Sequence, residues 1–242
     1  VRDFFIENAL YWLTEFGFDG LRLDAVDQTD DDFLLELARR VRSEGFERPV
    51  HLTTEDHRNV THLHRRDADG GASRFSAEWN DDFHNAAHAA VTGEHEGYYS
   101  DFAADPWASL GRALAEGYAW QGEFSRHAGH ARGAPCGQLP PICFIDFLQN
   151  HDQIGNRALG ERLITLAGVE RTQMLQAILL LSPHIPLLFM GEEWGETAPF
   201  LFFTDFHGEL ADAVREGRRR EFASFEGFSG DAGDIPDPNA VS

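Results

Sequence analysis

Acidic residues recur in this chain directly after short apolar segments, and each of those segments follows a stretch with helical spacing. Asp24 ends the first such segment, Glu55 follows the second, and Asp152 follows a later one. Asp24 and Glu55 are about 31 residues apart, which is the length of a repeating strand–helix unit with parallel strands. Because parallel strands end at the same edge of a sheet, this spacing predicts that the carboxylates converge.

Apolar periodicity predicts the elements that carry these residues. A first helix is expected over residues 2–16, with an apolar face of Phe5, Ala9, Trp12, Leu13 and Phe16. A second begins near the acidic residues 30–32 and buries Phe33, Leu34, Leu37, Ala38 and Val41. Further helices are expected over 169–181 and 210–222, with mixed helical and irregular structure over 83–130. The expected strands are 18–26, 50–54, 74–79, 143–149 and 185–190.

Five strands with helices between them fit two architectures, an open doubly wound sheet and part of an eight-stranded barrel. Polar residues at the strand ends favour the barrel, because its active face collects the carboxyl ends of all its strands. The fold prediction is therefore an α/β chain that forms a partial (β/α)₈ barrel over residues 1–225, followed by a loose tail or linker over 226–242. The acidic residues at the five predicted strand ends are Asp24, Glu55, Asp81 with Asp82, Asp152, and Glu192 with Glu193.

Composition narrows the partners. The formal net charge is −21 and the pI is near 4.8, which argues against nucleic acid and anionic membranes as partners and suits a neutral sugar. Neither a cofactor nor a metal is expected. Cys136 and Cys143 could form one bridge, but Cys143 lies in an apolar run typical of a small core residue, so a reducing, cytoplasmic location is expected. The chain begins at Val1, and we expect it to be a piece of a longer protein that is inactive by itself.

The three carboxylates fit acid–base and nucleophilic chemistry. Arg22 and Asp24 are two residues apart and share one face of a strand, and a neighbouring arginine keeps a carboxylate ionised, as a nucleophile must be. Glu55 fits a general acid, and Asp152 fits a group that binds sugar hydroxyls. Each also has a structural interpretation: a buried ion pair for Asp24, a solvated loop acid for Glu55 and a turn cap for Asp152.

These motifs resemble those of glycoside hydrolase family 13, the α-amylase family. Residues 20–24 are similar to its nucleophile motif on barrel strand four, Glu55 to its acid/base after strand five, and residues 150–152 to its strand-seven motif. Stretches 52–59, 79–84, 147–157, 188–195, 199–206 and 215–222 resemble the members that act on malto-oligosyl trehalose. The likeness implies hydrolysis, with retention, of the α-1,4 bond next to the trehalose end, by barrel strands four to eight. The family's strand-three motif is absent.

The resemblance also implies roles for other residues. Trp79 and Trp194 are candidates for stacking on sugar rings, although either could belong to the core. An alternative interpretation of residues 80–84 is a helix cap with an acidic first turn. The expected substrate-binding residues are Arg22, Asp27, Asn80, Asp81, Asp82, His84, His151, Gln153 and Asn156.

Three other functions remain open from the sequence. A branching enzyme, which transfers the glucan to a sugar hydroxyl, would share the same carboxylates. A non-catalytic glucan-binding protein would be expected to lack one of the three, and this chain keeps all of them. A metal hydrolase would have to use His62 with His64 or His127 with His130, and neither pair has the spacing of a zinc site.

Overall fold

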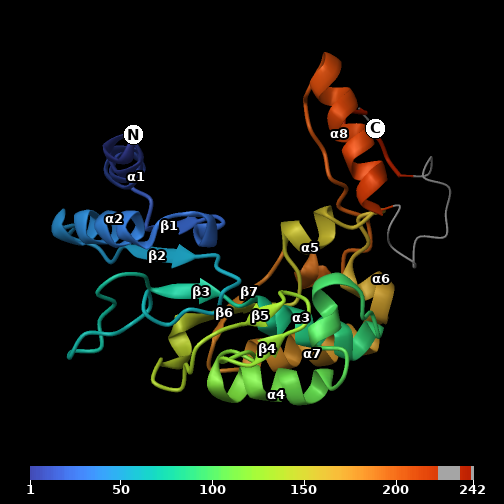
Figure 1. Cartoon of the computed structure of the whole chain (residues 1–242), viewed down its shortest axis with the longest axis horizontal. Coiled ribbons are helices and arrows are strands. Elements are labelled where there is room, and N and C mark those ends of the chain that lie inside the picture. Colours follow the sequence, from blue (N-terminus) through green and yellow to red (C-terminus); the bar gives the residue numbers. More distant parts are fainter. Residues whose placement is uncertain (223–234, 241–242) are drawn as a thin grey trace.

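The computed structural model describes residues 1–222 and 235–240, which are built on a five-stranded parallel sheet (Figure 1). Leu21 pairs with Leu52, and Glu78 with Phe144. The strand order follows the chain without reversing, as in successive strands of a barrel, whereas a doubly wound sheet reverses at a switch point. The predicted partial barrel is confirmed. In sheet order the strands are β1 (Gly20–Leu23), β2 (His51–Thr54), β3 (Ala77–Trp79), β6 (Phe144–Phe147) and β7 (Ile185–Leu187).

The helices agree in kind with those expected, and the strands are shorter than expected. The region 83–130 divides into helices and a small antiparallel hairpin of β4 (Phe124–Ser125) and β5 (His130–Ala131). The α-helices are α1 (Arg2–Glu15), α2 (Asp31–Ser43), α3 (Asp81–Thr92), α4 (Pro106–Glu116), α5 (His151–Gly155), α6 (Leu163–Ala167), α7 (Val169–Leu181) and α8 (Gly208–Phe222). The 3₁₀ helices are η1 (Val26–Gln28), η2 (Gly97–Asp101), η3 (Pro141–Cys143) and η4 (Glu192–Trp194).

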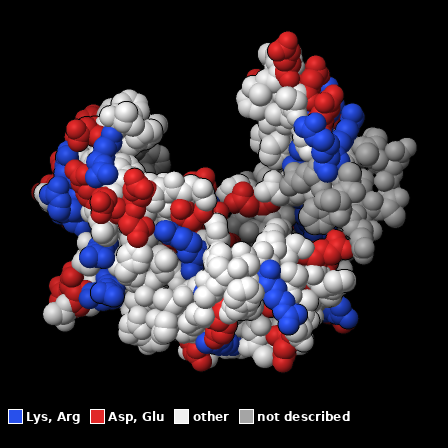
Figure 2. All heavy atoms as spheres, in the orientation of Figure 1, with Lys and Arg blue, Asp and Glu red and all other residues white. Residues whose placement is uncertain are grey.

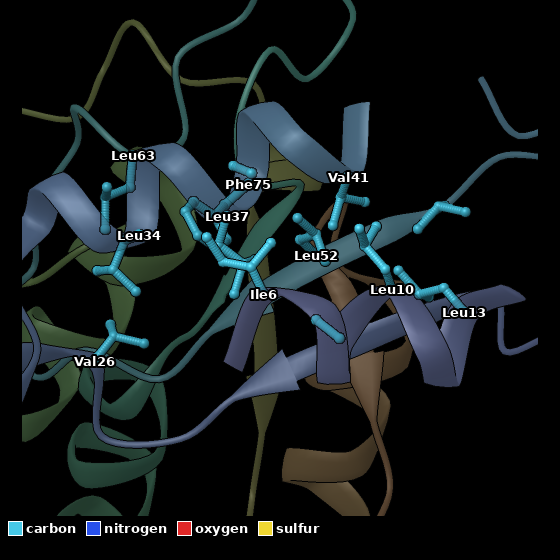
Figure 3. Packing of buried hydrophobic residues seen from close by; sticks show 13 residues of the cluster. Ile6, Leu10, Leu13, Val26, Leu34, Leu37, Val41, Leu52, Leu63 and Phe75 are labelled. Atoms are coloured by element: carbon cyan, nitrogen blue, oxygen red, sulfur yellow. The ribbon is translucent and has the colours of Figure 1, made fainter. Parts of the chain in front are cut away.

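One hydrophobic cluster joins α1 and α2 to the first two strands (Figure 3). Helix α2 contributes Leu34, Leu37 and Val41 at helical spacing, and Leu52 of β2 packs against them. Each fully buried leucine stabilises the fold by about 1.5–3 kcal/mol relative to an exposed one. The cluster holds β1 beside β2, and so fixes the positions of the two carboxylates that follow these strands.

The predicted apolar face of α1 is partly wrong. Ala9 and Leu13 are buried as expected, but Phe5, Trp12 and Phe16 are exposed. The helix buries Ile6 and Leu10 in their place. The reason is that α1 carries large apolar side chains on most of its surface, so two overlapping faces satisfy the same helical spacing.

The second half of the chain has its own core. Phe83 and Ala87 of α3 pack with residues of α4 and α7, including Leu110 and Leu175. Cys136 and Cys143 are buried and unpaired in a small separate cluster, so the interpretation of Cys143 as a core residue is confirmed and no bridge forms.

The end of the chain is only partly described. Residues 226–234 and 241–242 of the expected tail lie outside the described residues. Residues 235–240 are attached: Asp237 pairs with Arg215 of α8 at 2.7 Å, and Thr204 N–H donates to the Pro238 carbonyl at 2.7 Å. No helix among the described residues is long and apolar enough to cross a membrane.

Candidate active site

Arg22 joins the three predicted catalytic carboxylates. Its Nη1 forms an ion pair with Asp24, and its Nη2 lies 2.9 Å from Glu55 Oε2 and 3.9 Å from Asp152 Oδ2. These groups come from the end of β1, the end of β2 and the first turn of α5 after β6. The structure therefore brings together, around one guanidinium, three acids that are far apart in the chain.

The backbone after β1 is shaped to hold Glu55. Glu55 N–H donates to the Leu23 carbonyl at 3.0 Å, and Val26 N–H donates to the Glu55 carbonyl at 3.1 Å. Between them, Ala25 adopts the left-handed conformation with φ 45° and donates its N–H to Glu55 Oε2 at 2.9 Å. A non-glycine residue in this region is strained and is typical of functional sites. Nothing in the sequence distinguishes Ala25, and sequence reasoning missed it.

The Trp79 ring packs against the Arg22 side chain. The guanidinium carbon lies 4.2 Å from the centre of the Trp79 ring, a cation–π contact that orients the arginine. Because the arginine covers this ring face, Trp79 positions the ion-pair network and does not offer that face to a sugar. Trp194 follows β7, is 70% exposed, and donates its indole N–H to Glu196.

Buried polar contacts of Asp56, here called the buried layer, anchor the segment after Glu55. Asp56 is buried and forms an ion pair with Arg58 at 2.6 Å, while its backbone N–H donates to Glu78 Oε1 at 2.6 Å. Burial raises the pKa of Glu78 well above its usual value. This layer holds the backbone that presents Glu55 to the site.

A cavity of 480 Å³, here called the active-site cavity, is lined in part by Asp152. Figure 2 shows that the surface is hollowed between the part built by α1 and α2 and the projecting α8. The volume is within the range of about 300–1,000 Å³ for small-molecule sites. Most of the residues that line the cavity carry polar side chains, which can form hydrogen bonds to sugar hydroxyls. The lining includes the predicted residues Asp81, Asp152, Gln153 and Asn156, together with His57, Asn85, Tyr98, Asp101, Ser125, His127, Ala128, Arg132 and Phe222.

Four of the predicted binding residues, two of which line this cavity, are held in different ways. His151 is half-exposed, with its Nε2 3.4 Å from Asp152 Oδ2. Gln153 caps α5 by accepting a hydrogen bond from Asn150 N–H, and Asn156 is exposed at the end of that helix. The Asp27 side chain is 7% exposed and lies between Gln28 and His57.

The prediction that Asn80 and His84 line the sugar groove is wrong, because both are fully buried with protein partners. Asn80 Nδ2 donates to the Gly117 carbonyl and to Asp146 Oδ1. His84 Nδ1 lies 2.6 Å from the Leu148 carbonyl, and burial lowers the pKa of this histidine to about 3, so it is neutral. Both residues support the carboxyl ends of β3 and β6.

The same correction applies to Asp82, which is fully buried. Its Oδ2 accepts hydrogen bonds from Ala119 N–H, Trp120 N–H and Asn59 Nδ2, and its Oδ1 pairs with Arg132 at 2.8 Å. We expect Asp82→Ala to lower the free energy of unfolding by about 3 kcal/mol or more, because Arg132 would be left as an unpaired charge. Denaturant unfolding measures this change, and a parental midpoint would contradict the structural role.

Asp81 begins α3 and faces the other carboxylates. Burial raises the pKa of Asp81 to about 7; Arg132 opposes the shift, while Glu55, Asp82 and Asp152 add to it. Between the ordinary value of 3.8 and about 7 the folded state binds the extra proton, so raising the pH through this window destabilises the fold.

Asp81→Asn should therefore flatten the dependence of stability on pH between about 4 and 7, leaving the variant more stable than the parent at pH 8. Denaturant unfolding at pH 4, 6 and 8 tests this. Asp205→Asn, at a fully exposed carboxylate, is the matched control and should keep the parental slope. A parental slope in Asp81→Asn would show that Asp81 does not hold the proton.

Comparisons with known proteins relate the whole chain to one group of enzymes. Over 247 residues it is 42% identical to malto-oligosyltrehalose trehalohydrolase from Deinococcus radiodurans, a match that covers 99% of this chain and 39% of that protein. The enzyme of the same name from Saccharolobus solfataricus is 40% identical over 229 residues, covering 91% of this chain and 39% of that protein. The chain thus spans about two fifths of the length of these curated relatives.

Solved structures and a more distant sequence relative also match the chain. A crystal structure of a putative alpha amylase from Salmonella typhimurium superposes with a TM-score of 0.95 at 61% identity, covering 99% of this chain and 41% of that chain. Cyclic alpha-maltosyl-(1→6)-maltose hydrolase from Arthrobacter globiformis matches with a TM-score of 0.54 at 20% identity over 82% of this chain and 37% of that chain, which supports the fold alone. The 1,4-alpha-glucan branching enzyme of Rhodococcus jostii is 27% identical over 82% of this chain and 27% of that protein. No protein-family model matches the chain.

Proposed function

We propose that the carboxylates joined by Arg22 form the active site of a retaining glycoside hydrolase, because nearly the whole chain is similar to part of the malto-oligosyltrehalose trehalohydrolases at 40–42% identity. The observation that carries the proposal is the shared guanidinium. It brings Asp24 and Glu55 to opposite nitrogens of one planar group, in keeping with the close carboxylate spacing of retaining enzymes.

Asp24 is the nucleophile. Its side chain is 73% exposed, so an oxygen can reach a bound sugar while Arg22 keeps the group oriented. In the first step a bond forms between Asp24 and the anomeric carbon as the glycosidic C–O bond breaks. In the second step the oxygen of a water molecule attacks the same carbon and releases Asp24, so the configuration is retained over two inversions.

Glu55 is the acid and then the base. Its Oε2 is held by Ala25 N–H and Arg22, while no hydrogen bond from the described residues reaches Oε1. Oε1 is therefore the atom from which a proton passes to the leaving sugar oxygen, and to which the attacking water later returns one. Asp152, at the edge of the active-site cavity, binds sugar hydroxyls and stabilises the positive charge of the transition state.

The substrate is malto-oligosyl trehalose, cut at the α-1,4 bond next to the trehalose end. The alternatives are a branching enzyme, for which the weaker match to the Rhodococcus jostii protein is the specific observation, and a glucan-binding protein without activity. Incubating the intact protein with maltotriosyl trehalose should release free trehalose. New α-1,6 branches in amylose, without release of trehalose, would support the branching enzyme instead.

A cytoplasmic location belongs to the same proposal, since the unpaired thiols of Cys136 and Cys143 suit a reducing compartment. The net charge of −21 supports a neutral glucan rather than nucleic acid or an anionic membrane as the partner.

A further inference from the structure

A second cavity adjoins the active-site cavity. It has a volume of 380 Å³ and is here called the side cavity; its wall includes residues 92–97, Arg157 and Glu161. Tyr98, Asn156 and Phe222 line both cavities. Asp152 and Tyr98 both line the first cavity, so a sugar bound there beside Asp152 lies close to Tyr98, which also borders the second cavity.

Tyr98 is the accessible aromatic ring at this junction. It is 46% exposed, whereas Tyr99 and Phe222, the other aromatic residues of the two linings, are buried. The tryptophans that the sequence pointed to do not take this role, because Arg22 covers a face of Trp79 and Trp194 lines neither cavity. A tyrosine offers a flat apolar face with a polar edge, which matches a sugar ring with apolar faces and hydroxyl edges.

The Tyr98 ring rests on a rigid support. It packs edge-on against Tyr99 with ring centres 4.5 Å apart, and Tyr99 stacks on His88 at 4.4 Å with the planes 8° apart. His88 Nε2 lies 2.8 Å from Glu94, whose two oxygens each accept a hydrogen bond from Arg157 at 2.9 Å.

The ion pair of Glu94 with Arg157 in this support persists near neutral pH. Although burial opposes it, hydrogen bonds from His88 and Arg157 lower the pKa of Glu94 to about 2. Glu94 therefore remains ionised and paired, and the platform is preorganised, which reduces the entropy lost on binding.

We propose that Tyr98 is the stacking platform for a glucosyl unit of the substrate beyond those at the cleaved bond, and so determines the preference for chain length. The inference rests on the proposed function for the identity of the glucan. Tyr98 acts by binding and takes no part in bond cleavage, so its loss should change KM and leave kcat close to the parental value.

The test uses Tyr98→Ala, Tyr98→Leu and Tyr98→Phe in the intact protein, with malto-oligosyl trehaloses of increasing length. For the longer substrates Tyr98→Ala and Tyr98→Leu should raise KM about tenfold with kcat within about twofold, and Tyr98→Phe should remain parental because it keeps the ring. Tyr11→Leu is the matched control: Tyr11 is 50% exposed on α1, lines neither cavity, and should leave KM unchanged at every length.

Binding of linear malto-oligosaccharides, measured by calorimetry, separates this inference from the proposed function. A parent that releases no trehalose but binds longer glucans more tightly than Tyr98→Ala does would overturn the function and support the platform. A parent that releases trehalose, with parental KM in Tyr98→Ala at every length, would overturn the platform alone. Loss of kcat in Tyr98→Phe would also overturn it, because a ring that only stacks does not need its hydroxyl.

Discussion

Asp24→Asn in the intact protein should lower kcat by about 10⁴-fold or more while the fold remains intact, because the amide cannot form the covalent bond to the anomeric carbon. The side chain is 73% exposed, and an exposed ion pair contributes about 1 kcal/mol or less to stability, so the melting temperature should change little. Steady-state rates of trehalose release, together with thermal unfolding of the same preparation, measure both effects.

Asp19→Asn is the matched control for this variant. Asp19 directly precedes β1, so it lies at the opposite end of the strand that leads to Asp24; it is 82% exposed and also pairs with an arginine, Arg48. Its loss should leave kcat unchanged. Asp24→Ala excludes recovery of activity through deamidation of asparagine. Near-parental turnover in both Asp24 variants would remove the nucleophile assignment.

Glu55→Gln should lower kcat on malto-oligosyl trehalose by about 10²–10⁴-fold, because the leaving sugar oxygen then receives no proton. A glucosyl fluoride should lose much less in its first step, since fluoride departs without a proton. A much larger loss on the natural substrate than on the fluoride identifies Glu55 as the acid. A glutamate with only a structural role would lower both rates by the same factor.

The control here is Glu47→Gln. Glu47 is exposed in the turn before β2, so it lies at the opposite end of the strand that leads to Glu55, and its loss should leave both rates parental. Equal losses on the natural substrate and on the fluoride in Glu55→Gln would mean that Glu55 orients the substrate or the fold and does not transfer the proton.

The strand ends and their carboxylates were predictable because they depend on local patterns. Residues 50–54 alternate apolar Val50 and Leu52 with polar His51 and Thr53, as in a strand, and β2 forms within this segment. The parallel pairing of β1 with β2 was predictable because α2, between them, is long enough to cross back over the sheet. No helix separates β2 from β3, which are joined by an irregular segment. The prediction of a barrel rather than a doubly wound sheet rested on one observation, that the polar residues follow the carboxyl ends of the strands and so lie at one rim.

Other features depend on tertiary packing that local patterns do not contain. Asp82 and Asp81 are adjacent acids at the start of α3, yet Asp82 is buried against the loop at residues 119–120 and Asp81 lines the active-site cavity. The sequence around them is equally polar, so only the path of the 117–132 segment decides which one is covered. The strained Ala25 likewise follows from the requirement to direct an N–H toward Glu55.

The pairing of Asp24 with Glu55 on one glycosidic bond is tested most directly by trapping the covalent intermediate. The Glu55→Gln variant of the intact protein, treated with an activated glycosyl fluoride, should accumulate a glycosyl adduct, because its breakdown needs the missing base. Peptide mapping by mass spectrometry is expected to find the sugar on Asp24. An adduct on another residue, or turnover of the fluoride to a product of inverted configuration without an adduct, would contradict the account.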